Sequence, residues 1–320
     1  MPSRTRDEWI RLAKWRCLNT LATHSICPIR MIEAKVCEAG PGDKRPNPLS
    51  VSDALKQLRN EGRIDRVKHQ VRDAEFFFDA RIDINREPHR ALFLNRLALY
   101  RKYIAFATEN QLCGFVLEQV LDDAINRSGV ATFVSRFPGC NIPQGRPLDS
   151  VFTVRGQLVG AEAKNLREWL YPESVEIWNL LSKCHSIDAL PVLVARKLPY
   201  VTYLLFKKVG ILGYQTHFQY FHPQLTAELE SIKRVDGLGF KDIRTSLGPD
   251  LNLTRYIQNV LPRNLEDFKQ RFLAAKPLVL KYCSGRGLAN DKVKGFQRRQ
   301  AYSDFWKELT GTEMDENSFV

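Results

Sequence analysis

The sequence has no CxxC pair among its seven cysteines and no long apolar run. An odd set of unpaired cysteines supports neither a disulfide framework nor a zinc site, so we expect reduced thiols. The longest apolar run, near residues 189–195, is far shorter than the roughly 20 residues that a membrane-spanning helix needs. Serine-hydrolase and P-loop motifs are also absent. We therefore expect a soluble, cytoplasmic protein with no membrane partner.

Basic residues, in contrast, are in excess. The 320 residues hold 48 Lys and Arg against 36 Asp and Glu, a formal charge of +12. The excess is concentrated in residues 1–72, with 15 basic against 8 acidic side chains, whereas residues 301–320 form an acidic tail with 1 against 5. Because cations that neutralise phosphates release condensed counterions, this charge indicates a polyanionic partner. Charge alone does not distinguish DNA from RNA or from a lipid surface.

The first 85 residues show the pattern of a small DNA-binding module. Helical periods cover residues 7–24 and 29–37, and a third helix opens with a Ser N-cap and ends at Gly62. Apolar residues alternate in 63–67 and cluster in 75–78, as in the two strands of a hairpin. Helix, helix, basic helix and hairpin is the winged-helix order, so we predict that Lys56, Arg59 and Arg63 contact DNA. A module that binds protein remains an alternative.

The rest of the chain predicts an α/β (α+β) fold with three further regions. Residues 86–110 form a linking helix, and residues 111–222 form a core of mixed sheet flanked by helices. In this core we expect a helix ending at Ser128-Gly129, a strand at 130–135, a hairpin at 151–164 about Gly156, and then helix 172–184, strand 190–195, helix 200–209 and strand 211–220. Residues 223–320 are expected to form several short helices and the acidic tail.

The hairpin carries the residues that point to chemistry. Glu162 and Lys164 are two residues apart on one strand, so both side chains leave the same face. Asp149 precedes the other strand, so folding about the turn brings it beside Glu162. Two carboxylates with the backbone carbonyl of Ala163 are oxygen ligands suited to Mg²⁺ or Mn²⁺. Lys164 would orient a water or offset negative charge that develops on a phosphate. The constellation therefore predicts phosphodiester hydrolysis.

These residues resemble a known nuclease motif. Pro147-Leu148-Asp149 and Glu162-Ala163-Lys164 look like the PD-(D/E)xK motif of restriction-endonuclease-like proteins, and the resemblance covers about residues 110–220. It implies a restriction-endonuclease-like fold. In several branches, including Holliday-junction resolvases and Mrr-type nucleases, an acidic residue on the preceding helix also faces the site, and Glu118 holds a matching place. A winged helix followed by a nuclease is similar to the Mrr-type order. Leu148 between Pro and Asp departs from the strict motif.

The tripeptide by itself has little specificity. The same [DE]xK pattern occurs at Glu33-Ala34-Lys35 and Asp267-Phe268-Lys269, both within helical patterns and without a preceding Asp-hairpin. An exposed hairpin with a charge pair, or a folded but inactive nuclease core, is compatible with the same residues. Further residues could approach the substrate or equally serve the surface or scaffold: Arg196, Lys207, Lys208, Gln215 and His217.

The function that these patterns favour is a metal-dependent endonuclease, a hydrolase that cuts double-stranded DNA, with a role in the restriction of foreign DNA. Cutting both strands of a duplex favours a homodimer. Two alternatives stay open at this point: a non-catalytic winged-helix DNA-binding regulator, and an RNA nuclease, because the catalytic chemistry does not select the sugar.

Overall fold

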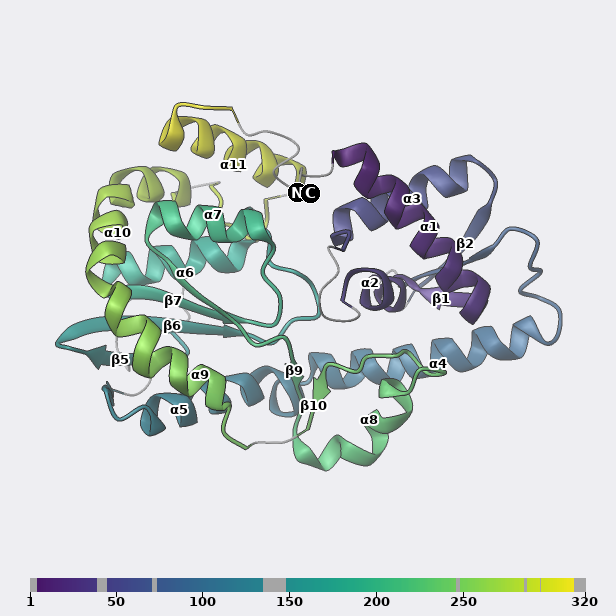
Figure 1. The fold of residues 1–320 in the computed structure, drawn as a ribbon, viewed down its shortest axis with the longest axis horizontal. Helices are drawn as coiled ribbons and strands as arrows, with labels where there is room; N and C mark the ends of the chain where they lie inside the picture. Colours follow the sequence, from purple (N-terminus) through teal and green to yellow (C-terminus); the bar gives the residue numbers. More distant parts are fainter. Residues whose placement is uncertain are drawn as a thin grey trace. The chain divides into compact units, whose positions relative to one another are not determined.

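The chain folds into two compact units (Figure 1). The computed structural model describes residues 5–38, 45–70, 74–134, 148–245, 248–284, 287–293 and 295–313. Among the described residues, unit 1 is formed by those up to Glu109 together with Gln224–Ile243, and unit 2 by Asn110–Pro223 together with those from Arg244 to Glu313. Pro147 of the predicted motif and residues 314–320 of the predicted acidic tail lie outside the described residues.

Unit 1 contains the elements that the sequence predicts for its N-terminal part. A three-stranded antiparallel sheet has the order β1-β3-β2, and the chain inserts a short strand between the first two helices. In chain order the elements are α1 (Arg6–His24), β1 (Ile26–Pro28), α2 (Ile29–Cys37), α3 (Pro48–Asn60), β2 (Ile64–His69) and β3 (Ala74–Asp79). The predicted helices and hairpin are thus confirmed, and β1 is an addition.

The start of α3 differs from the prediction. Its N-cap is Asn47, whose side chain accepts a hydrogen bond from the backbone N–H of Ser50 at 2.8 Å. The predicted Ser cap is wrong because Pro48, which has no N–H to lose at the first helical position, allows the helix to begin earlier. The predicted end is confirmed: Gly62 follows the helix with φ 66°, a conformation that glycine adopts without strain.

Helix α4 (His89–Thr108), predicted as a link between domains, contributes to the core of unit 1. Its Tyr100 ring packs edge-on against Phe76 of β3, with centroids 6.0 Å apart. Its Tyr103 packs in the same way against Phe240, at 5.0 Å. Phe240 follows α8 (Thr226–Lys233), whose Leu229 and Ile232 are fully buried. The later segment is therefore part of this unit's core, whereas the sequence placed it in a C-terminal region.

Unit 2 is built on the mixed sheet that the sequence predicts. Its order is β4-β5-β6-β7-β8, in which the first three strands are antiparallel and the last three are parallel. The strands are β4 (Ala131–Phe133), β5 (Ser150–Val154), β6 (Gln157–Lys164), β7 (Leu190–Ala195) and β8 (Leu212–Gln215). Among the described residues, the predicted strand over 211–220 is interrupted after Gln215 and resumes as β9 (Gln219–Tyr220). His217, in the interruption, has φ 62° and cannot continue a strand.

Helices cover both faces of this sheet. Figure 1 shows α6 (Val175–Ser186) and α7 (Tyr200–Val209) on one face and α5 (Phe115–Arg127) on the other. Two glycines mark places where the sheet and the helices α6 and α7 lie especially close together. A Cβ on Gly160 would lie 2.8 Å from the sulfur of Cys184 in α6, and one on Gly213 would lie 2.8 Å from the ring of Phe206 in α7. Glycine therefore lets these helices sit directly on β6 and β8.

The C-terminal part of unit 2 is more regular than the sequence predicts. After α9 (Leu251–Arg255) and a π-helical turn at Tyr256–Val260, α10 (Leu261–Cys283) runs for 23 residues and α11 (Gly295–Thr310) for 16. The prediction of several short helices fails because Pro262 occupies the first turn of α10, where proline removes no helical hydrogen bond. No helix in the described ranges is both long enough and apolar enough to cross a membrane.

Candidate active site

The β5–β6 hairpin brings the predicted carboxylates together. Arg155 and Gly156 both have positive φ, 50° and 77°, as a tight two-residue hairpin turn requires. Ser150 pairs with Ala161, so the preceding Asp149 lies level with Glu162. The Oδ2 atom of Asp149 accepts a hydrogen bond from the backbone N–H of Ala163 at 2.8 Å and lies 3.7 Å from the Nζ of Lys164. The predicted convergence of Asp149, Glu162 and Lys164 is therefore present.

Glu162 is a buried acid between two lysines. Its side chain is 3% exposed, and its two carboxylate oxygens each accept a hydrogen bond, Oε2 from Lys164 and Oε1 from Lys183. Lys183 lies near the end of α6, where its own side chain is 13% exposed. A buried carboxylate is tolerated only when it is paired and hydrogen-bonded, and these two ammonium groups meet that requirement. The cluster of Asp149, Glu162, Lys164 and Lys183 has no net formal charge.

Lys183 was not predicted from the sequence. The sequence predicts a helix over 172–184 but no site residue on it, and a lone lysine near a helix end is usually solvated. The contact depends on a crossover that lays α6 over β6, with Cys184 packed at Gly160. The only local signal is that Lys183 follows the motif within the same β6–α6–β7 crossover.

The charged groups of the cluster shift one another's pKa values. Burial and the neighbouring Glu162 carboxylate raise the pKa of Asp149. Burial alone would also raise the pKa of Glu162, but Lys164 and Lys183 outweigh it, so this pKa is lowered. Burial would lower the pKa of Lys164, and the attraction of Glu162 and Asp149 raises it instead. Glu162 is therefore held as a carboxylate, and Lys164 as an ammonium ion.

Glu118, the fourth predicted site residue, lies half-buried in the first turn of α5. One turn later on the same helix, Asp122 accepts a hydrogen bond from the hydroxyl of Ser150. Residues four apart share a helix face, so Glu118 lies on the side of α5 that meets the start of β5. Ser150 and Asp149 are consecutive residues. Glu118 is thus near the strand that carries Asp149, but on the sheet face opposite α6.

The donor set fits a small divalent cation. Asp149 and Glu162 provide carboxylate oxygens, and the N–H of Ala163 faces Asp149. Because the N–H and carbonyl of one strand residue point to the same side, the Ala163 carbonyl faces that side too. Mg²⁺ requires only one or two protein carboxylates and keeps several waters. No group of three or more His, Cys, Asp or Glu side chains suited to a metal occurs among the described residues, so a larger acidic cage is not formed there.

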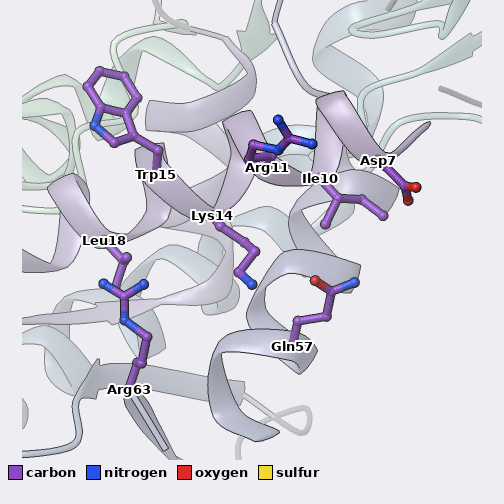
Figure 2. Close-up of a pocket in the computed structure, with 8 residues that line it drawn as sticks. All are labelled: Asp7, Ile10, Arg11, Lys14, Trp15, Leu18, Gln57 and Arg63. Carbon is purple, nitrogen blue, oxygen red and sulfur yellow. The ribbon is translucent and has the colours of Figure 1, made fainter. Parts of the chain in front are cut away.

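The predicted DNA-contacting residues lie on the surface of unit 1. Lys56 and Arg63 are exposed and Arg59 is half-buried. In the part of the chain that the structure describes, neither Lys56 nor Arg59 forms an ion pair. A groove of about 600 Å³ runs between α1 and α3, and Figure 2 shows Lys14 of α1 directed toward the side where Gln57 and Arg63 lie. Lys56 lines two further grooves on α3, so it stands on the ridge between them.

The remaining sequence candidates separate into scaffold and surface. Arg196 is 1% exposed, and its guanidinium donates to the backbone carbonyls of Leu166 and Arg167, so it supports a loop. Lys207 and Lys208 are exposed in the last turn of α7. Gln215 and His217 lie at the end of β8, where the Gln215 Nε2 is 2.8 Å from the His217 Nδ1.

Comparison with known proteins gives no relative: no family model, curated protein or solved structure matches the chain.

Proposed function

We propose that this protein is a metal-dependent nuclease of the PD-(D/E)xK type, in which unit 2 has a restriction-endonuclease-like fold and cuts DNA. The observation that carries the proposal is the meeting of Asp149, Glu162 and Lys164 at the end of one hairpin. The order helix, strand, strand, strand, helix, strand in unit 2 supports the fold, as does the mixed sheet with helices on both faces. Restriction of foreign DNA would be its biological role.

A divalent cation, Mg²⁺ or Mn²⁺, would be held by Asp149, Glu162 and the carbonyl of Ala163. Such an ion polarises a phosphate and lowers the pKa of a coordinated water. The backbone N–H of Ala163 fixes the Asp149 carboxylate by its Oδ2 atom. Burial of Glu162 under α6 keeps the second carboxylate at one position. The chain therefore presents both acids in a preformed arrangement.

The two lysines have different places in this proposal. In the metal-free site Glu162 and Asp149 raise the pKa of Lys164, and its ammonium group would act as a cation toward the phosphate. Its side chain is 24% exposed, against 13% for Lys183. Lys164 can therefore reach an incoming phosphate, whereas Lys183 positions Glu162 from behind. Both ammonium groups offset the charge of the carboxylates while no substrate is present.

Unit 1 would bind the DNA as a winged helix. The chain order of α1, β1, α2, α3, β2 and β3 and the sheet order β1-β3-β2 support this assignment. Helix α3 would enter the major groove, because its outer face carries polar side chains that can meet base edges and phosphates. Those that line the surface grooves are Ser52, Asp53, Lys56, Gln57, Arg59 and Asn60, and Asp53 is paired with Arg6 of α1.

Replacing both Lys56 and Arg59 by alanine should weaken DNA binding. Each cation that meets a phosphate contributes about one unit to the slope of log affinity against log salt concentration, so the slope should fall by about 2. Fluorescence anisotropy with a labelled duplex at several salt concentrations measures it. Arg86→Ala/Arg90→Ala, a charge-matched change before and at the start of α4, is the control. An unchanged slope in the α3 variant would show that α3 does not touch the phosphate backbone.

The nuclease proposal is tested with supercoiled plasmid, linear duplex and RNA, each incubated with Mg²⁺ or Mn²⁺ and with a chelator. We expect nicking or linearisation of DNA that needs the metal. A protein that shifts DNA on a gel without cutting it in either metal would be a DNA-binding regulator, and the proposal would fail. Cleavage of RNA alone would assign the same chemistry to an RNA nuclease. Size measurement with and without duplex reports whether a homodimer assembles.

A further inference from the structure

A second polar cluster lies at the carboxyl ends of the parallel strands of unit 2. We call this group, which consists of Lys197, Gln215 and His217, the edge cluster. The Nζ of Lys197 lies 3.2 Å from the Nδ1 of His217, and the Nε2 of Gln215 lies 2.8 Å from the same atom. His217 is exposed, and Lys197 and Gln215 are half-buried. The edge cluster therefore presents nitrogen donors at the surface.

Gln215 of the edge cluster shares a sheet face with the candidate active site. Lys164 is in register with Ala195 of β7, and Ala195 with Gln215 of β8, so the side chains of all three leave the same face. Lys197 and His217 follow Ala195 and Gln215 by two residues and contact each other. Neighbouring strands are about 4.8 Å apart, so two steps separate the backbone of Lys164 from that of Gln215 by roughly 10 Å.

The backbone that carries the edge cluster is fixed. His217 has φ 62°, a conformation that is uncommon for a residue with a side chain. Its N–H donates to the carbonyl of Arg196 at 3.1 Å, and the side chain of Gln215 accepts from the N–H of Leu198 at 2.8 Å. Arg196 itself is held by the carbonyls of the loop after β6. A strained, exposed residue held from several sides is a common feature of binding sites.

We propose that the edge cluster binds a backbone phosphate of the nucleic-acid strand that is cut at Asp149, Glu162 and Lys164. The inference rests on the proposed nuclease function and names a second contact of that site with its substrate. Each nucleotide advances a strand by at least about 3.4 Å, so roughly 10 Å places that phosphate within about three nucleotides of the cleaved bond. Lys197 supplies charge, and His217 and Gln215 supply N–H donors in a fixed arrangement.

The first test measures binding without cleavage. A short fluorescein-labelled DNA duplex is titrated with the full chain in chelator at several salt concentrations. We expect Lys197→Ala/His217→Ala to bind about tenfold more weakly, with a salt slope lowered by about 1. Lys197→Arg, which keeps the positive charge, should keep the wild-type salt slope. Lys208→Ala removes the same charge from the far end of α7 and should bind like the wild type. Far-ultraviolet circular dichroism confirms that each variant is folded.

The second test measures cleavage in Mg²⁺. The Lys197→Ala/His217→Ala variant should raise KM more than it lowers kcat, since the edge cluster holds substrate and does not touch the reacting atoms. A neutral methylphosphonate is placed in turn at each of about the first three phosphates beside the cleaved bond, and at one of these positions it should slow the wild type but not the variant. If the wild-type protein cleaves DNA and the variant has unaltered binding and KM, this inference is overturned and the nuclease proposal stands. If the variant binds DNA more weakly but the wild-type protein does not cleave it, the edge cluster is still a phosphate site and the nuclease proposal is refuted.

Discussion

Replacing Asp149 or Lys164 by alanine is expected to abolish DNA cleavage, with a loss of at least about a thousandfold in kcat. Asp149 would lose a metal ligand, and Lys164 would lose the cation that meets the phosphate. Unit 1 and the edge cluster still contact the DNA in both variants, so duplex affinity in chelator should fall far less than cleavage does. Single-turnover cleavage at saturating duplex, with anisotropy in parallel, separates the two effects.

The chain contains its own control for this experiment. Asp267-Phe268-Lys269 repeats the same tripeptide pattern on α10, where Asp267 forms an exposed ion pair with Arg271. Asp267→Ala and Lys269→Ala remove the same charges and should cleave like the wild type. If purified Asp149→Ala and Lys164→Ala cut DNA as fast as these controls, the hairpin is not the active site.

Glu162→Ala is expected to have the largest effect on stability, a loss of about 3–5 kcal/mol in the free energy of unfolding of unit 2. The reason is that it leaves the partly buried ammonium groups of Lys164 and Lys183 close together and without their shared carboxylate. Urea unfolding followed by circular dichroism measures the loss. Glu308→Ala removes an exposed glutamate that pairs with Lys281 and should leave the free energy of unfolding close to the wild-type value.

A second substitution tests the cause. If the cost comes from unpaired cations, Glu162→Ala/Lys183→Met should be more stable than Glu162→Ala, because the methionine stem fills similar space without a charge. Equal stability of the two variants would mean that the loss reflects the missing side-chain volume and not the electrostatics. Lys183→Met alone should leave Glu162 less firmly held and reduce kcat. Lys164 would still donate to the Oε2 atom of Glu162 in this variant.

The hairpin and its carboxylates could be predicted because their geometry is local. The Arg155-Gly156 turn, the alternation along β6 and the position of Asp149 before β5 all follow from a short stretch of sequence. The helices and hairpin of the first 85 residues and the element order from α4 to β8 were predictable for the same reason, whereas β1 and the long helix α10 were not. Within such a stretch, a two-residue period decides which side chains share a face.

The features that could not be predicted depend on contacts between distant residues. The Lys183–Glu162 bond requires the path of α6, which periodicity does not give. The interruption of the strand over 211–220 depends on His217, whose backbone N–H donates to the carbonyl of Arg196 in the loop after β7. The length of α10 depends on where prolines fall within the helix, and Pro277 is accommodated inside it. In each case tertiary packing overrides the local signal.

The two-segment composition of unit 1 has a consequence for how the chain can fold during synthesis. Tyr103 on α4 needs Phe240, and the sheet of unit 2 is encoded between them. The N-terminal unit therefore cannot complete its core until the ribosome has made every strand of the larger sheet. A fragment that stops at Glu109 would expose the aromatic surface that this late segment covers, which favours aggregation.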